Sequence, residues 1–191
     1  MDIQVALQNR RTVRLFQQEP VPDQDLAELL DAARMASCGG NKQCLRYQVI
    51  RDRGLAERVF AQTAWAALVQ PKRNPQWGST APLNFIAVLA PVKGGTVCHA
   101  DAGAAIQSMQ LLAFAKGLGC CWLGAIQRDR LQEILEVPAE MQVLYLLAVG
   151  YPAEAPIAED VPGDASVAYY LDEQQRLHVP KIRRDDLAIW K

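Results

Sequence analysis

The stretch DAGAAIQSMQLLAFAKGLG, residues 101–119, decides the fold class. We expect a helix that begins at Asp101 and ends at Gly117 or Gly119, where glycine favours a helix end. Its apolar residues cover most faces of the helix instead of forming one stripe. Such a helix must be covered on several sides, so it lies either inside a fold thicker than two layers or in a subunit interface.

The segments around this helix carry both helix and strand signals. Helices are predicted at residues 2–8, 20–37, 55–68 and 128–135, and strands at 45–50, 83–90 and 143–152. Residues 69–82 are rich in turn formers and predict a surface loop, and the chain is again turn-rich between 152 and 177. Because regular β-α-β alternation is missing, we expect an α+β fold with helices on a sheet, formed by a single domain over residues 1–191.

Composition limits the class of protein. Half of the 191 residues are hydrophobic, which is enough for a sizeable core, and the net charge of −1 argues against nucleic acid as a partner. The apolar runs are too short to span a bilayer, and the N-terminus does not resemble a signal peptide. Five cysteines, an odd number, fit a reducing compartment, so we expect a cytoplasmic protein without a membrane partner.

Two basic clusters lie near opposite ends of the chain. The sequence RRTVR supplies three guanidinium groups and a hydroxyl group, and PKIR places two cations on an extended segment. Arginine matches the geometry of phosphate, so the clusters could share one phosphate group, although each could equally be a solvated basic surface. The residues concerned are Arg10, Arg11, Thr12 and Arg14, and Lys181 and Arg183.

The stretch SCGGNKQCLRY, residues 37–47, raises three other possibilities. The Cys38-x5-Cys44 spacing does not match zinc sites, so no metal is expected. A disulfide between these cysteines is not expected in a reducing compartment, and the stretch lacks the pattern of a phosphate loop. The amides of Asn41 and Gln43 both donate and accept hydrogen bonds, which suits the edge of a heterocycle. A plain polar turn between a helix and a strand remains the alternative.

A second cysteine pair is followed by a glycine that could serve a ligand. Cys120 and Cys121 could be redox-active, but adjacent small residues more often pack in a core. Gly124 would allow the backbone to approach a flat ligand closely.

Four stretches in this order resemble the nitroreductase family of FMN-dependent oxidoreductases. They are RRTVRLFQQEPVP, AARMASCGGNKQCLRYQVI, DAGAAIQSMQLLAFAKGLGCCWLG, and VGYP followed by YYLDEQQRLHVPKIR. The resemblance implies a three-layer α+β fold with a mainly antiparallel central sheet. It also implies a homodimer with a swapped C-terminal arm and two FMN sites at the subunit interface, where the residue 101–116 helix is buried.

The resemblance also assigns cofactor contacts. The first cluster would hold the FMN phosphate and the ribityl-to-pyrimidine side, and Lys181 and Arg183 would close on the phosphate. The flavin edge would be lined from the partner subunit, and a segment after the long helix would back the ring. The edge residues would be Cys38, Gly39, Asn41 and Gln43, and the backing residues Leu123, Gly124 and Ala125.

This sequence departs from the family pattern beside the expected flavin. Ser37, Cys38 and the pair Cys44-Leu45 stand where the family often has proline, serine and Pro-Trp. The first two alter the loop at the flavin, and the third changes the substrate pocket. Trp65 and Trp77 could cover the active site or simply pack against other residues of the protein.

By this resemblance the flavin does the chemistry and the protein holds and tunes it. NADH or NADPH would give hydride to FMN and leave, and a nitroaromatic or quinone would then take the same place. Arg14 is the candidate for stabilising reduced flavin by its charge. Alternatives are ene reduction, dehalogenation or flavin destruction, a flavin sensor or carrier without turnover, and a thiol-redox protein.

Overall fold

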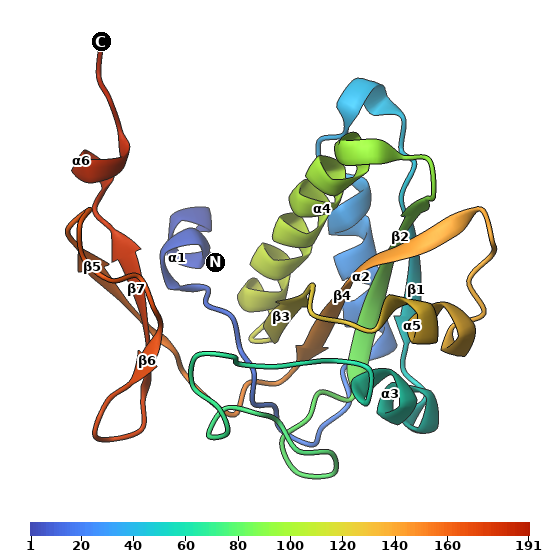
Figure 1. Cartoon of the computed structure of the whole chain (residues 1–191), viewed down its shortest axis with the longest axis horizontal. Helices are drawn as coiled ribbons and strands as arrows, with labels where there is room; N and C mark the ends of the chain where they lie inside the picture. The colour runs from blue at the N-terminus through green and yellow to red at the C-terminus, as the bar shows by residue number, and fades with distance from the viewer.

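The computed structural model describes residues 1–191. Its core is a four-stranded antiparallel sheet in the order β1-β2-β4-β3 (Figure 1). The strands are β1 (Arg46–Ile50), β2 (Asn84–Pro91), β3 (Gly119–Leu123) and β4 (Met141–Gly150). The central strands β2 and β4 are covered on both faces, which explains why their sequences are nearly continuous apolar runs.

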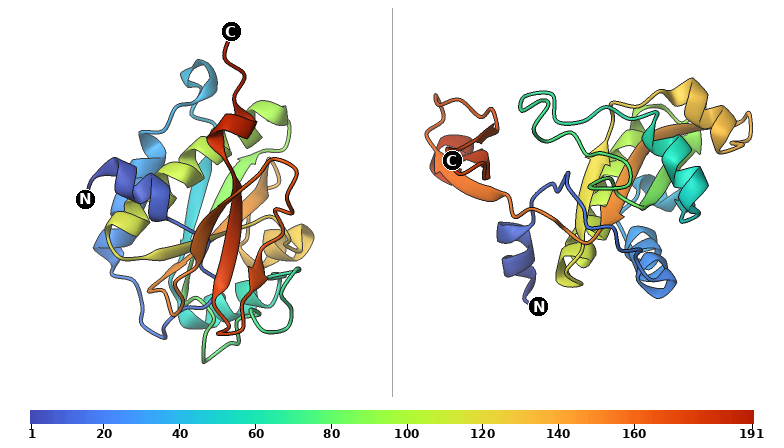
Figure 2. Two further views of the ribbon diagram at one scale, coloured as in Figure 1. Left: turned by 90° about the vertical axis from the view of Figure 1, so that its left-hand side faces the viewer. Right: turned by 90° about the horizontal axis from the view of Figure 1, so that it is seen from below.

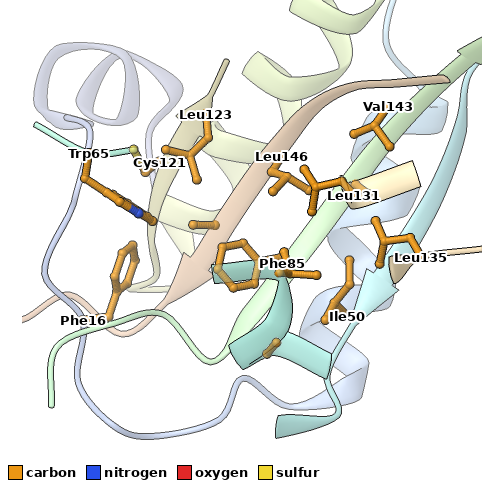
Figure 3. Packing of buried hydrophobic residues seen from close by; sticks show 14 of the residues in the cluster. Phe16, Ile50, Trp65, Phe85, Cys121, Leu123, Leu131, Leu135, Val143 and Leu146 are labelled. Atoms are coloured by element: carbon orange, nitrogen blue, oxygen red, sulfur yellow. The ribbon is translucent and has the colours of Figure 1, made fainter. Parts of the chain in front are cut away.

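Helices cover both faces of this sheet (Figure 1). On one face α2 (Asp23–Arg34) and α4 (Gly95–Ala115) pack against alternate residues of β2 and β4, such as Ile86 and Leu147. On the other face α3 (Arg53–Phe60) and α5 (Arg128–Ile134) pack against residues that include Phe85 and Leu146 (Figure 3). The predicted three-layer α+β architecture is therefore confirmed.

The long helix α4 begins earlier than the sequence predicted. It starts at Gly95, whose backbone is left-handed at φ 64°, and not at Asp101. Asp101 is consequently not a cap but a buried side chain inside the helix, 6% exposed. One stripe of α4 packs against α2 and the sheet, whereas Gln107, Ser108 and Leu112 on another stripe are only half-buried in the single chain.

The helix predicted over residues 55–68 is wrong in its second half. α3 ends at Phe60, and Ala64 instead donates its backbone N–H to the Ala125 carbonyl at 2.9 Å. Trp65 turns into the core, 7% exposed, with its indole N–H donating to Thr63 Oγ1 at 2.6 Å (Figure 3). Tertiary pairing with the segment after β3 outweighs the helical propensity of these residues.

The C-terminal part forms an arm that the sequence did not predict as a sheet. Its strands are β5 (Ile157–Val161), β6 (Tyr170–Leu171) and β7 (Leu177–Ile182), in the order β5-β7-β6, followed by α6 (Arg184–Leu187). Figures 1 and 2 show this arm standing apart from the core. Leu177, 2% exposed, anchors its lower end to the core cluster on the α3–α5 face.

Two shorter helices complete the chain. They are α1 (Ile3–Asn9), which the side chain of Asp2 caps by accepting the Gln4 N–H, and the 3₁₀ turn η1 (Gly39–Asn41). No helix of the structure is both long enough and apolar enough to cross a membrane.

Candidate functional site

The first basic cluster is held against the edge strand β3. Thr12 forms an isolated parallel bridge with Cys120, and the Val13 N–H donates to the Cys120 carbonyl at 3.0 Å. A Cβ atom at Gly119 would lie 2.7 Å from Val13 Cγ2, so only glycine permits this close approach. Pairing with β3 and the close approach that Gly119 permits therefore fix the backbone of this cluster.

A buried carboxylate fixes the end of this segment. Oε1 of Glu154 accepts hydrogen bonds from the backbone N–H groups of Arg14 at 2.6 Å and Leu15 at 3.2 Å. Its Oε2 lies 3.1 Å from Nε of Arg73, and the two side chains are 6% and 15% exposed. The Arg14 guanidinium lies over the ring of Tyr169, 4.6 Å from the centroid, in a cation–π contact.

Sequence reasoning missed Glu154. It follows the turn after β4 and lies 140 positions along the chain from Arg14. No local pattern indicates such a contact, because both partners lie outside regular elements. In the sequence, a buried glutamate cannot be told from an exposed one.

The cations of the first cluster do not all have the same role. Arg11 donates to the carbonyl groups of Gln8 and Arg10, so it closes the end of α1. Burial, and then the charge of Arg11, lowers the pKa of Arg10. Neither Arg10 nor Arg14 forms an ion pair within the chain. Arg10 and Arg14 are thus the cations of this cluster that remain available to an anion.

The second basic cluster lies on the arm. Lys181 is near the end of β7, and Arg183 follows it in an extended conformation with its N–H donating to the Val161 carbonyl at 2.9 Å. Both side chains are exposed and neither forms an ion pair within the chain. No hydrogen bond or ion pair joins them to the first cluster, so the single chain does not show the shared phosphate site that the resemblance implies.

The turn at residues 38–43 lies beyond the opposite edge of the sheet, next to β1. Three of its residues have left-handed backbones, Gly40 at φ 58°, Asn41 at φ 52° and Gln43 at φ 48°. A left-handed backbone is costly for a residue other than glycine and persists where the surroundings enforce it. Here the Gln43 side-chain amide donates to Asn41 Oδ1 at 3.0 Å, and Cys38 Sγ accepts the Gln43 N–H at 3.1 Å.

Asp101 of α4 anchors this turn. Its Oδ1 accepts the Gly39 N–H at 2.9 Å, while its buried Oδ2 has no hydrogen-bond partner. Asp101 also lines a cavity of about 350 Å³ between the end of α2, the turn and the start of β1. Cys38, Gln43 and Cys44 line the same cavity. Two of the predicted flavin-edge residues, Cys38 and Gln43, thus border a cavity with an unpartnered carboxylate oxygen.

The two predicted halves of the cofactor site lie at opposite edges of the sheet. The Arg10–Arg14 segment runs alongside β3, whereas the Cys38–Gln43 turn comes just before β1 in the chain. The strands β4 and β2 lie between them. Because the segment pairs with the outer edge of β3, four strand spacings separate it from β1, roughly 19 Å at about 4.8 Å each. Within one copy of the chain, the width of the sheet therefore separates the two halves.

The predicted backing segment ends β3. Leu123 is 5% exposed and its side chain belongs to the core cluster in Figure 3, so only its backbone could contact a ligand. Gly124 and Ala125 are exposed, and a Cβ atom at Gly124 would make an ordinary contact of 3.7 Å with Tyr145. Packing within the chain therefore does not require glycine at position 124.

Several other candidates pack in the core. Cys120 and Cys121 are buried, and burial raises the pKa of both thiols, that of Cys121 to about 12. Such thiols are poor nucleophiles at neutral pH. Trp65 is buried in the core, and Trp77 packs against Phe60 with ring centroids 5.7 Å apart.

Comparison with known proteins identifies relatives along most of the chain. The model of the Nitroreductase family matches residues 7–151. The chain is 29% identical to the NADH dehydrogenase of Thermus thermophilus over 188 residues, which cover 81% of this chain and 88% of that protein. It is 28% identical to the 5,6-dimethylbenzimidazole synthase of Rhodospirillum rubrum over 181 residues, which cover 82% and 85%.

A solved structure of a protein described as a nitroreductase is also similar to this chain. A protein from Desulfovibrio desulfuricans, described as a nitroreductase and solved in complex with FMN, superposes with a TM-score of 0.68 at 27% identity. The superposition covers 85% of this chain and 93% of that one.

Proposed function

This chain belongs to the nitroreductase family, and from that premise we propose that it is an FMN-dependent NAD(P)H oxidoreductase. When bound, FMN would accept hydride from NADH or NADPH and pass it to a small acceptor such as a nitroaromatic or a quinone, the two substrates binding in turn. The observation that carries this proposal is the pair of cations, Arg10 and Arg14, held at the β3 edge without an ion-pair partner.

The residues of the first basic cluster fit FMN. Arg10 is partly buried with a lowered pKa and faces no carboxylate in the chain, so binding an anion there would compensate the cost of its burial. The Thr12 hydroxyl and the Arg14 guanidinium continue from Arg10 along an extended segment. These donors match a ligand with a phosphate at one end and carbonyl groups at the other.

Arg14 would tune the cofactor. The Glu154 carboxylate and the Tyr169 ring hold its backbone and its guanidinium. A fixed positive charge beside the ring would stabilise the added negative charge of the reduced state. No acid–base dyad is needed from the protein, since the chain would bind and orient its ligands.

The complete site is proposed to need a homodimer. The Cys38–Gln43 turn of one copy would border the ring held by Arg10–Arg14 of the other, and the half-buried stripe of α4 would lie between the copies. The arm, which stands apart from the core in Figures 1 and 2, would reach the partner and bring Lys181 and Arg183 to a phosphate. The chain is proposed to act as one domain over residues 1–191, and its five free thiols support a cytoplasmic location.

Steady-state kinetics tests this function. The purified protein, supplied with FMN, is expected to oxidise NADH or NADPH only when a nitroaromatic or quinone is present. Double-reciprocal plots at several acceptor concentrations should give parallel lines, as in a ping-pong cycle. A flavin sensor or carrier would bind FMN and consume no nicotinamide with any acceptor in the panel.

A second candidate function is synthesis of a dimethylbenzimidazole, the activity for which the Rhodospirillum rubrum relative is named. The observation in its favour is that match over 82% of this chain. Chromatography of the products separates the two candidates, because only a synthase yields 5,6-dimethylbenzimidazole.

A further inference from the structure

Two cysteines far apart in the sequence meet beside the cavity. Sγ of Cys44, which lies just before β1, is 3.0 Å from Sγ of Cys98 in the first turns of α4. Both are free thiols. Neither the spacing of the cysteines in the sequence nor the assigned FMN contacts predicts this pair.

The surroundings hold the two sulfur atoms together. Cys98 is 3% exposed, and a Cβ atom at Gly94 would lie 2.5 Å from its Sγ, so the glycine leaves room for the sulfur. Cys44 is half-buried and lines the 350 Å³ cavity, which gives a small molecule access to its sulfur. The thiol of Cys38 is engaged elsewhere, since it accepts the Gln43 N–H.

We propose that Cys44 and Cys98 are a peroxide-sensitive thiol pair that closes to an intrachain disulfide. The oxidant is a hydroperoxide, with hydrogen peroxide as the simplest example. Because a disulfide bond is about 2.05 Å long, the sulfur atoms need to approach by about 1 Å. That movement is within the reach of side-chain rotation and leaves the sheet unchanged.

The two thiols differ in reactivity. The hydrogen bond with Cys44 and then burial together raise the pKa of Cys98 to about 11. Cys98 therefore stays protonated at neutral pH, and Cys44 is the more accessible sulfur. Cys44 is the expected site of first attack because its sulfur is accessible from the cavity and that of Cys98 is buried.

The chemistry balances with one molecule of hydrogen peroxide. The Cys44 thiolate attacks the O–O bond and becomes a sulfenic acid, and the departing hydroxide takes up the proton that Cys44 released. Cys98 then loses its proton, and its sulfur attacks Cys44 and expels hydroxide, which leaves as water with that proton. Two thiols lose two electrons and two protons in total, and the peroxide is reduced to two molecules of water.

The link would fasten the turn at residues 38–43 to α4. In the reduced protein, the Gly39 N–H donates to Asp101 at one end of this turn, and the thiol–thiol contact lies at the other. A disulfide would replace that contact with a covalent attachment. The reaction does not require bound flavin, because both thiols belong to this chain and the oxidant is the hydroperoxide.

Trypsin provides a sharp test because it separates the cysteines. The expected peptides 35–42, 43–46, 94–116 and 117–128 carry Cys38, Cys44, Cys98 and the Cys120–Cys121 pair. The folded, purified protein is treated with a small excess of hydrogen peroxide, its remaining thiols are alkylated, and the digest is analysed by mass spectrometry. We expect two of the five thiols to be lost. Peptides 43–46 and 94–116 should appear joined, and a dithiol reductant should release them.

Single substitutions provide the controls. Cys44→Ser and Cys98→Ser should abolish the joined peptide, and Cys38→Ser, at a neighbouring half-buried cysteine, should leave it intact. Thermal melting of the reduced variants verifies that they are folded. A link that includes Cys38, conversion of Cys44 to a sulfinic acid with Cys98 still free, or retention of all five thiols would overturn the proposal.

Discussion

The carboxylate of Glu154 holds the backbone of Arg14, with Oε1 only 2.6 Å from the Arg14 nitrogen. The same oxygen accepts the Leu15 N–H, and the other oxygen faces Arg73. This contact joins the root of the C-terminal arm, the loop after α3 and the basic cluster at β3. The position of Arg14 thus depends on a residue far from it in the sequence.

Removal of Glu154 should therefore destabilise the protein. Glu154→Ala leaves two backbone N–H groups without their acceptor and the 15% exposed Arg73 without its ion-pair partner, so we expect the free energy of unfolding to fall by about 3 kcal/mol. Glu133, whose side chain is 69% exposed in a pair with Arg130, is the control, and Glu133→Ala should cost less than about 1 kcal/mol. Urea denaturation measures both, and equal losses would show that Glu154 is not an anchor.

Arg14→Ala is expected to lower the flavin reduction potential and the turnover. Loss of a positive charge next to the ring should lower the two-electron potential by roughly 30 mV or more, since 30 mV corresponds to about 1.4 kcal/mol. Arg14→Lys keeps the charge and should change the potential less. Spectral titration against a reference dye measures it, and an unchanged potential in a variant with an intact flavin spectrum would remove this assignment.

Substitution of two adjacent arginines on the arm, Arg183 and Arg184, distinguishes a specific contact with phosphate from a general effect of positive charge. Arg183→Ala should weaken FMN binding about tenfold, as expected for one charge-assisted hydrogen bond of about 1.4 kcal/mol. Arg184→Ala, which removes the same charge one position later from an exposed pair with Asp185, should have little effect. Quenching of FMN fluorescence gives both affinities, and equal effects would exclude a specific role for Arg183.

Stability of the arm should depend on pH through His178. Its two ring nitrogens lie 3.1 Å from Asp172 Oδ2 and Glu159 Oε2, and Tyr170 stacks on the ring. The hydrogen bond to Asp172, followed by that to Glu159, raises the pKa of His178 above its ordinary 6.5. Its contribution to stability is therefore fully present below pH 6.5 and is lost as the pH rises through the folded-state pKa.

Asp172 sets the lower limit of this range. Burial acts to raise its pKa, but hydrogen bonds from Arg176 and His178 outweigh it and lower the pKa to about 2. The contribution of this carboxylate is complete above its ordinary pKa of 3.8 and is lost as the pH falls through about 2. The arm should accordingly be most stable between about pH 4 and 6.5.

NMR titration of the two histidines checks this prediction. The ring protons of His178 should titrate above pH 6.5, and amide protection of residues 157–182 should decrease as they do. In a His178→Gln variant the protection should lose that pH dependence, whereas His99→Gln should retain it. A His178 pKa at or below 6.5 would contradict the account.

Much of the core was predictable from the sequence because local patterns determine it. The buried runs of β2 and β4 and the amphipathic face of α2 were located within a few residues. Asp101 was misread as a helix start because an acidic residue before an apolar run looks the same whether it caps a helix or is buried within one. The end of α3 was missed because pairing with Ala125 determines it.

The sequence could not predict features that depend on distant contacts. β5 and β7 are short, and β7 contains Pro180, so neither has a clear strand signal in the sequence. Their strand conformation depends on their pairing with each other. The same applies to Glu154 and to the contact between Cys44 and Cys98, which are 54 positions apart. The cofactor contacts stay predictions, because their two halves lie at opposite edges of the sheet in one copy.

The visible absorption spectrum of the purified protein tests the central claim most directly. The account predicts a flavin spectrum, either as isolated or after addition of FMN and removal of the excess, and release of FMN on denaturation. A folded protein that stays colourless and binds no added FMN would contradict it.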